Sequence, residues 1–134
     1  MKILCDTHII IWYLTGDNRL SQKARELIDD ESNEIFYSLV SVWEVAIKHG
    51  RKPEKLTLSS QDFVSFCNEQ NFMEYPLHQN HIFTVDTLTR PANVPEHHDP
   101  FDRLLVSQAK ADGLTFMTHD SLISFYNETC VLMV

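Results

Sequence analysis

Four acidic residues lie far apart in the chain at places where they could act together on a metal ion. They are Asp6, Glu44, Asp102 and Asp120. Carboxylates are preferred ligands of Mg²⁺ and Mn²⁺, and a bound ion of this kind can activate water for hydrolysis of a phosphate ester. Asp6 directly follows an apolar run and Asp120 comes shortly after another, while Glu44 and Asp102 lie in helical patterns.

Each acid also has a simpler explanation as a helix cap. Asp6 could cap the helix that follows it, and Asp120 could cap the short helical segment after it. Glu44 lies three residues after Ser41, which is the spacing of a capping box. Asp99, which a proline follows, is the predicted N-cap of the helix that contains Asp102.

The neighbours of two acids favour a role beyond capping. The residues three, four and seven positions after Asp102 are apolar, so its side chain flanks the buried face, whereas Arg103 lies on the polar side. Glu44 is embedded in the segment VWEVAI, which is apolar on both sides. A carboxylate directed toward the interior is unfavourable unless a cation compensates its charge. We therefore expect a divalent cation at these acids.

Short apolar runs alternate with helical patterns along the chain, which predicts an α/β fold with a mostly parallel, about five-stranded sheet flanked by helices. In such a sheet, the ligand crevice lies at the carboxyl ends of the strands, where several of the acids occur. The expected strands are 2–5, 34–38, 72–76, 114–118 and 130–134. The expected helices are 7–14, 21–30, 41–50, 61–70, 78–88, 100–109 and 121–127, with Ile82, Phe83 and Val85 on the apolar side of the fifth.

Composition indicates one soluble globular domain spanning residues 1–134, of which 43% are hydrophobic. The net charge of -8 disfavours a simple duplex-DNA binder, because such proteins neutralise phosphates with basic residues. The longest apolar run, His8–Leu14, is too short to cross a membrane and lacks the features of a signal peptide. The three cysteines show no CxxC spacing, so we expect reduced thiols and a cytoplasmic location.

Basic residues and histidines near these acids each allow two interpretations. Lys48, Arg51, Lys52 and Lys55 form either a solvated loop or a basic strip that receives a polyanion, to which Arg103 could contribute. The histidines could in principle bind zinc, but they lack an HxxxH pairing, and the adjacent His97 and His98 would point in different directions. We therefore interpret the histidines as polar loop residues or as contacts to a phosphate near the site, rather than as zinc ligands.

Four segments in order resemble one family over essentially the whole chain. The segments are ILCDTHIIIWYL, SVWEVAIK, HHDPFDRLLVSQA and TFMTHD. They are similar to the PIN-domain ribonucleases, and within that family to the VapC-type toxins of type II toxin–antitoxin systems. This resemblance implies a PIN-like three-layer fold, cleavage of RNA, a cognate antitoxin protein and a homodimer.

The resemblance also implies roles for individual residues. The metal-binding, catalytic acids of the family correspond to Asp6, Glu44, Asp102 and Asp120, which would hold one or two Mg²⁺ or Mn²⁺ ions for phosphodiester hydrolysis. Thr7 and Thr118 match small hydroxyl residues beside these acids, and Asp99 is an alternative contact. Lys48, Arg51, Lys52 and Arg103 are candidate RNA-binding residues. Two positions depart from the common pattern, because His98 and His119 occur where the family often has arginine or, at the second position, a small residue.

Two other classes of protein compete with the nuclease interpretation. A non-catalytic PIN-like module would bind RNA or protein without a converging set of acids. An aspartyl-phosphate protein, such as a phosphatase with Asp6 as nucleophile, would have a second aspartate where this chain has His8. The intact set of acids favours the nuclease over both.

Overall fold

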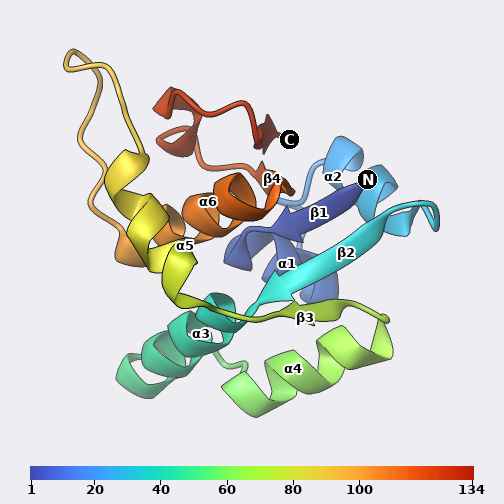
Figure 1. Cartoon of the computed structure of the whole chain (residues 1–134). Helices are drawn as coiled ribbons and strands as arrows, with labels where there is room; N and C mark the ends of the chain where they lie inside the picture. The colour runs from blue at the N-terminus through green and yellow to red at the C-terminus, as the bar shows by residue number, and fades with distance from the viewer.

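A parallel five-stranded sheet with the strand order β3-β2-β1-β4-β5 forms the centre of the molecule (Figure 1). The structure is a computed structural model that describes all 134 residues. The strands are β1 (Lys2–Cys5), β2 (Glu34–Ser38), β3 (Met73–Tyr75), β4 (Thr115–Thr118) and β5 (Val131–Met133). The helices are α1 (Thr7–Thr15), α2 (Gln22–Asp29), α3 (Leu39–Arg51), α4 (Ser60–Glu69), α5 (Gln79–Thr84), η1 (Val85–Thr87), α6 (Pro100–Asp112) and η2 (Ile123–Phe125).

Side chains alternate between the two faces of the sheet and so build two cores. Ile3 and Cys5 of β1 belong to a core of 15 buried residues that α1, α2, α3 and α4 also supply. Leu4, between them in sequence, belongs to a second core of nine buried residues in which Leu105 and Val106 of α6 take part. The sheet is thus covered on both faces, which confirms the predicted three-layer α/β fold.

The central pair of strands, β1 and β4, determines which acids meet. Leu4 pairs with Phe116 and Cys5 pairs with Met117 in the parallel register. The backbone N–H of Asp6 then donates to the carbonyl of Met117 at 2.9 Å. Asp6 and Thr118 therefore leave the sheet side by side at its carboxyl edge, although 112 positions separate them in sequence.

Two of the possible helix caps are absent. Helix α3 begins at Leu39, two residues earlier than expected, and its N-cap is Ser38, whose hydroxyl accepts from the N–H of Val40 at 3.0 Å. The interpretation of Ser41 and Glu44 as a capping box is therefore wrong. Asp6 precedes α1 but makes no side-chain hydrogen bond to that helix. Both acids are thus left free for another role.

The predicted cap of α6 is confirmed. A carboxylate oxygen of Asp99 accepts from the N–H groups of Phe101 at 2.9 Å and Asp102 at 3.1 Å, and Pro100 occupies the first turn. The helix ends at Gly113, whose φ of 69° lies in the left-handed region that favours glycine. This cap fixes the position of the first turn of α6, which carries Asp102.

The apolar side expected for the fifth helix is wrong. Ile82 and Phe83 are 51% and 62% exposed, whereas His81 is fully buried against α6. Nδ1 of His81 accepts from the N–H of His78 at 2.9 Å, and its Nε2 lies 2.7 Å from a carboxylate oxygen of Asp112. Hydrogen bonds at both ring nitrogens make burial of a histidine favourable, and hydrophobic periodicity cannot reveal them.

No helix of the structure is both long enough and apolar enough to cross a membrane. Cys5, Cys67 and Cys130 are all free thiols, as expected from their spacing. Burial raises the pKa of the Cys67 thiol to about 12, so this cysteine is a packing residue rather than a nucleophile.

A pair of substitutions on α5 tests the observed orientation of this helix. His81→Ala should lower the free energy of unfolding by roughly 2–4 kcal/mol, because it leaves a cavity and removes a partner of Asp112. Phe83→Ala should lower it by about 0.5 kcal/mol or less, because that ring is exposed. Urea unfolding of both variants measures the difference, and a larger effect at Phe83 would contradict the structure.

Candidate active site

An acidic cavity of about 320 Å³ lies at the carboxyl edge of the sheet. Four aspartates line it, and they come from four places in the fold: the end of β1, the N-cap of α6, the first turn of α6 and the loop after β4. They are Asp6, Asp99, Asp102 and Asp120. The cavity therefore brings three of the four predicted catalytic acids together with the alternative contact Asp99.

One carboxylate oxygen of Asp6 has a hydrogen-bond partner and the other has none. Its side chain is only 3% exposed, and Oγ1 of Thr118 donates to its Oδ2 at 2.7 Å. Its other oxygen, Oδ1, is buried without any hydrogen-bond partner. A buried carboxylate oxygen that accepts no hydrogen bond is unfavourable, and a cation at this point would satisfy it.

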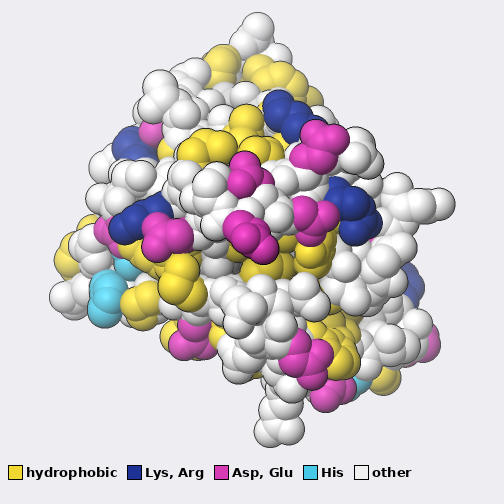
Figure 2. Space-filling view, turned by 90° about the vertical axis from the view of Figure 1, so that its right-hand side faces the viewer, with side chains coloured by type: hydrophobic (Ala, Val, Ile, Leu, Met, Phe, Trp, Pro, Cys, Tyr) yellow, Lys and Arg dark blue, Asp and Glu magenta, His cyan; other side chains and the backbone are white.

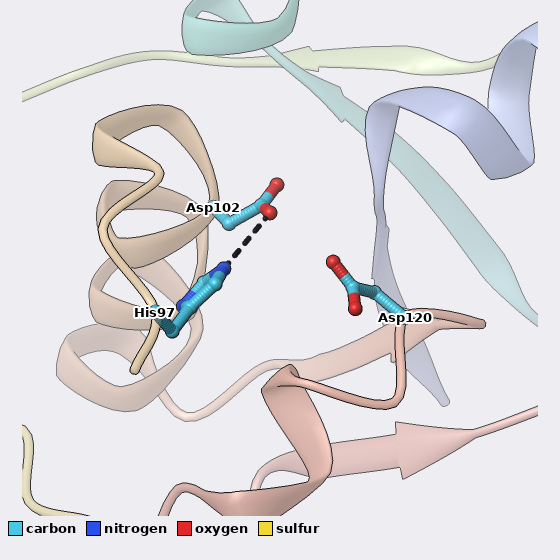
Figure 3. Close-up of side chains that lie close together, drawn as sticks. All are labelled: His97, Asp102 and Asp120. Atoms are coloured by element: carbon cyan, nitrogen blue, oxygen red, sulfur yellow. Dashed lines mark hydrogen bonds and ion pairs between the residues drawn. The ribbon is translucent and has the colours of Figure 1, made fainter. Parts of the chain in front are cut away.

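Asp102 projects from α6 toward Asp120, as Figure 3 shows. Asp102 is 7% exposed, and one ligand atom each from His97, Asp102 and Asp120 lie within 4.8 Å of one another. Oδ1 of Asp120 accepts from the N–H of Leu122 at 2.9 Å, which is a capping contact to the short helical segment that follows. Asp120 thus both holds the loop after β4 and faces the acidic cavity.

His97 lies in the loop before α6, as predicted, but its side chain is buried beside the acidic cavity and contacts one of the acids. Its ring is buried, with Nε2 at 3.2 Å from Oδ2 of Asp102 and Nδ1 at 2.8 Å from the hydroxyl of Tyr126. Burial lowers the pKa of His97, so its neutral form is favoured. The neutral ring can donate from Nε2 to Asp102 and accept at Nδ1 from Tyr126, so both nitrogens are engaged in orienting the acid.

His98 behaves as the sequence predicts. It points to solvent, where its Nε2 lies 2.8 Å from a carboxylate oxygen of Glu96. The predicted divergence of His97 and His98 is therefore correct. Which of the two is buried depends on Tyr126, a residue 29 positions away from His97, so local sequence carried no signal for it.

Glu44 lies beside the acidic cavity rather than in its lining. It is 1% exposed, its Oε1 lies 2.7 Å from Oγ1 of Thr7, and its Oε2 contacts Nζ of Lys48. Thr7 Oγ1 is also 2.8 Å from the hydroxyl of Ser41, so it can accept from Ser41 and donate to Glu44. These contacts hold Glu44 at the N-terminal end of α1, near Asp6.

Burial close to other acids opposes the ionisation of Asp6 and Asp102. Burial, followed by the charges of Asp6, Asp99, Glu44 and Asp120, raises the pKa of Asp102 to about 8. Burial raises the pKa of Asp6 to about 6, although the hydrogen bond from Thr118 opposes this shift. Oxygen donors, mutual repulsion and an unpartnered oxygen together fit a hard divalent cation such as Mg²⁺ or Mn²⁺.

A larger basic cavity of about 630 Å³ adjoins the acidic one, since both are lined by residues of α1. Basic side chains at and beyond the end of α3 line it, together with Thr7 and Glu44. They are Lys48, Arg51, Lys52 and Lys55. Arg103, the remaining candidate for RNA binding, lines neither cavity.

This basic lining contrasts with the face of the molecule that Figure 2 shows. Figure 2 views the molecule from the side on which β2 begins, away from the carboxyl edge of the sheet. Asp and Glu side chains are interspersed there with Lys and Arg, and no continuous basic surface is visible. The net negative charge of the chain is therefore compatible with a local site for a polyanion.

Comparison with known proteins shows the family and the fold of this chain. Residues 3–126 match the sequence model of the PIN domain, and the chain therefore belongs to the PIN domain family. It is also similar to a chain in the crystal structure of VapBC2 from Rickettsia felis bound to a DNA fragment from their promoter. That match has 13% identity and a TM-score of 0.66, and covers 100% of this chain and 98% of the other. No curated protein shows significant sequence similarity to this chain.

The raised pKa of Asp102 predicts how the stability of the metal-free protein depends on pH. The ordinary pKa of an aspartate is 3.8 and that of folded Asp102 is about 8, so between these values the folded protein keeps a proton that the unfolded chain releases. Asp102 therefore makes the free energy of unfolding fall as pH rises from about 4 to about 8. Asp102→Asn should remove this dependence and stabilise the metal-free protein by roughly 1–3 kcal/mol more at pH 8 than at pH 5.

Urea unfolding with a chelator present measures this effect. Asp86→Asn, which changes an exposed carboxyl outside both cavities, is the matched control and should give no such gain. An Asp102→Asn protein with the same stability as the wild type at both pH values would contradict the electrostatic account.

Proposed function

We propose that this protein is a metal-dependent endoribonuclease that acts as the toxin of a toxin–antitoxin pair. The observation that carries the proposal is the convergence of four aspartates on one cavity, two of them buried, with the Oδ1 atom of Asp6 left unpartnered. Membership of the PIN domain family supports it. A toxin of this kind would act in the cytoplasm.

The residues that would hold Mg²⁺ or Mn²⁺ are Asp6, Asp102 and Asp120, with Glu44 as a direct ligand or one that acts through water. When bound, such an ion lowers the pKa of a coordinated water and stabilises negative charge on the phosphate. The contribution of the chain is to hold the oxygen donors in place. Thr118 orients Asp6, Thr7 orients Glu44 and His97 orients Asp102.

The basic cavity supports RNA as the substrate. A phosphate backbone that enters the acidic cavity must overcome the repulsion of several carboxylates. Lys48, Arg51 and Lys52 can attract that backbone from the adjoining cavity. Arg103 has no part in this proposal, because it lies outside both cavities.

Two observations support a protein partner. The similar solved structure from Rickettsia felis is that of a VapBC2 complex, which suggests a cognate antitoxin for this chain as well. In addition, Trp43 on α3 and Phe83 on α5 are 61% and 62% exposed, and large exposed apolar side chains are common where proteins associate. These surfaces are available to an antitoxin or to a second copy of the chain in a homodimer.

Cleavage of single-stranded RNA with and without divalent cation tests the proposal. Wild-type protein should cleave RNA with Mg²⁺ or Mn²⁺ and should lose activity with a chelator. Asp102→Asn should reduce the rate at least about 100-fold, more than the loss usual for a residue that only orients a ligand. Asp86→Asn should retain the wild-type rate, and Mn²⁺ should raise the Tm of this control but not that of Asp102→Asn.

The same assay distinguishes the alternatives. Folded wild-type protein that binds RNA without cleaving it under any divalent cation would instead support a non-catalytic PIN-like module. Cleavage that persists in chelator, or in Asp102→Asn, would show that the acidic cavity is not the catalytic site.

A further inference from the structure

The acidic and basic cavities meet at one point on the surface. Three residues line both of them: His8 and Trp12 of α1, and Arg19 in the loop after that helix. The ring of Trp12 lies between the two histidines of this region, with centroids 6.0 Å from His8 and 5.8 Å from His119. An extended polymer that occupies both cavities would therefore pass these side chains.

Arg19 is fixed in place although its side chain is 68% exposed. Its Nε donates to Oδ1 of Asp17 at 3.1 Å, and its Nη2 donates to Oδ2 at 2.7 Å. Its guanidinium carbon also lies 5.2 Å from the centre of the Trp12 ring, which is a cation–π contact. A guanidinium has five N–H groups, so those not used by Asp17 remain available to an anion.

Arg19 also differs in charge from everything around it in the acidic cavity. Four aspartates line that cavity, and Arg19 is the only lysine or arginine among its lining residues. The other basic residues of the basic cavity, Lys48, Arg51, Lys52 and Lys55, do not line the acidic cavity. Arg19 is therefore the one permanent cation that both cavities share.

We propose that Arg19 binds a backbone phosphate of a single-stranded nucleic acid where the strand crosses from the basic cavity into the acidic one. This inference rests on the proposed function for the identity of the strand, but its geometry involves no metal. Asp17 and Trp12 hold the guanidinium, so little side-chain freedom is lost on binding, and Arg19 places the adjoining phosphodiester over the acids. Trp12 places an aromatic ring beside that phosphate on the same path.

The chain contains a close structural control for Arg19. Arg25 on α2 has its guanidinium carbon 5.7 Å from the centre of the Tyr13 ring, so it makes the same kind of cation–π contact with the next aromatic residue of α1. Arg25 lines neither cavity. Replacing either arginine removes one positive charge and one such contact, but only Arg19 lies on the proposed path.

The test measures binding of a short fluorescein-labelled single-stranded RNA by fluorescence anisotropy. An Asp102→Asn background with Mg²⁺ keeps the RNA intact, and Arg19→Ala, Arg19→Lys and Arg25→Ala are each added to it. Arg19→Ala should weaken binding about tenfold or more, and should reduce the salt dependence of log K by about 0.7. Arg19→Lys should weaken binding less and retain the salt dependence, because lysine keeps the positive charge but lacks the planar N–H donors of the guanidinium. Arg25→Ala should bind as the background protein does.

Equal binding by Arg19→Ala and Arg25→Ala would overturn the inference, as would the absence of any RNA binding by the background protein. Circular dichroism of Arg19→Ala checks that the protein is folded, and recovery of the salt dependence in Arg19→Lys excludes a loss caused by misfolding. A wild-type protein that fails to cleave RNA would contradict the proposed nuclease but not this result. The binding of the four proteins decides the role of Arg19 in either case.

Discussion

The burial of two carboxylates close to other acids is the main physical constraint at the carboxyl edge of the sheet. Asp6 and Asp102 are nearly inaccessible to water, and their raised pKa values show that burial and neighbouring negative charge oppose ionisation of both. Folded protein can tolerate this only if other interactions hold the acids in place or if a cation neutralises them. Hydroxyl and imidazole groups hold the acids, and the unpartnered oxygen of Asp6 lies where the proposed cation would bind.

The parallel sheet makes this concentration of charge possible. Because β1 and β4 are neighbours, Asp6 and Thr118 leave the sheet side by side, and the loop after β4 brings Asp120 to the same edge. The capped first turn of α6 then places Asp102 above them. Two packed cores lie beneath, so the stability of the sheet compensates for the unfavourable edge.

Many features of this arrangement were predictable from sequence, because local patterns determine them. Apolar runs located all five strands, and the proline after Asp99 identified the cap of α6. Periodicity failed for α5, where hydrogen bonds to His78 and Asp112 favour burial of His81 instead of the apolar residues.

The parts of the candidate site that sequence missed depend on contacts between distant residues. His97 is buried because Tyr126 and Asp102 bond to its two nitrogens, and no local pattern encodes that pairing. Arg19 likewise became a candidate only when the folded chain placed it between the two cavities.

The acidic cavity should bind a divalent cation. Crystals grown with Mn²⁺ test this expectation, since anomalous scattering locates manganese independently of the refined coordinates. An anomalous peak is expected between Asp6, Asp102 and Asp120, in contact with Oδ1 of Asp6. A peak located only elsewhere, or no peak at saturating Mn²⁺ with the four aspartates arranged as described, would contradict it.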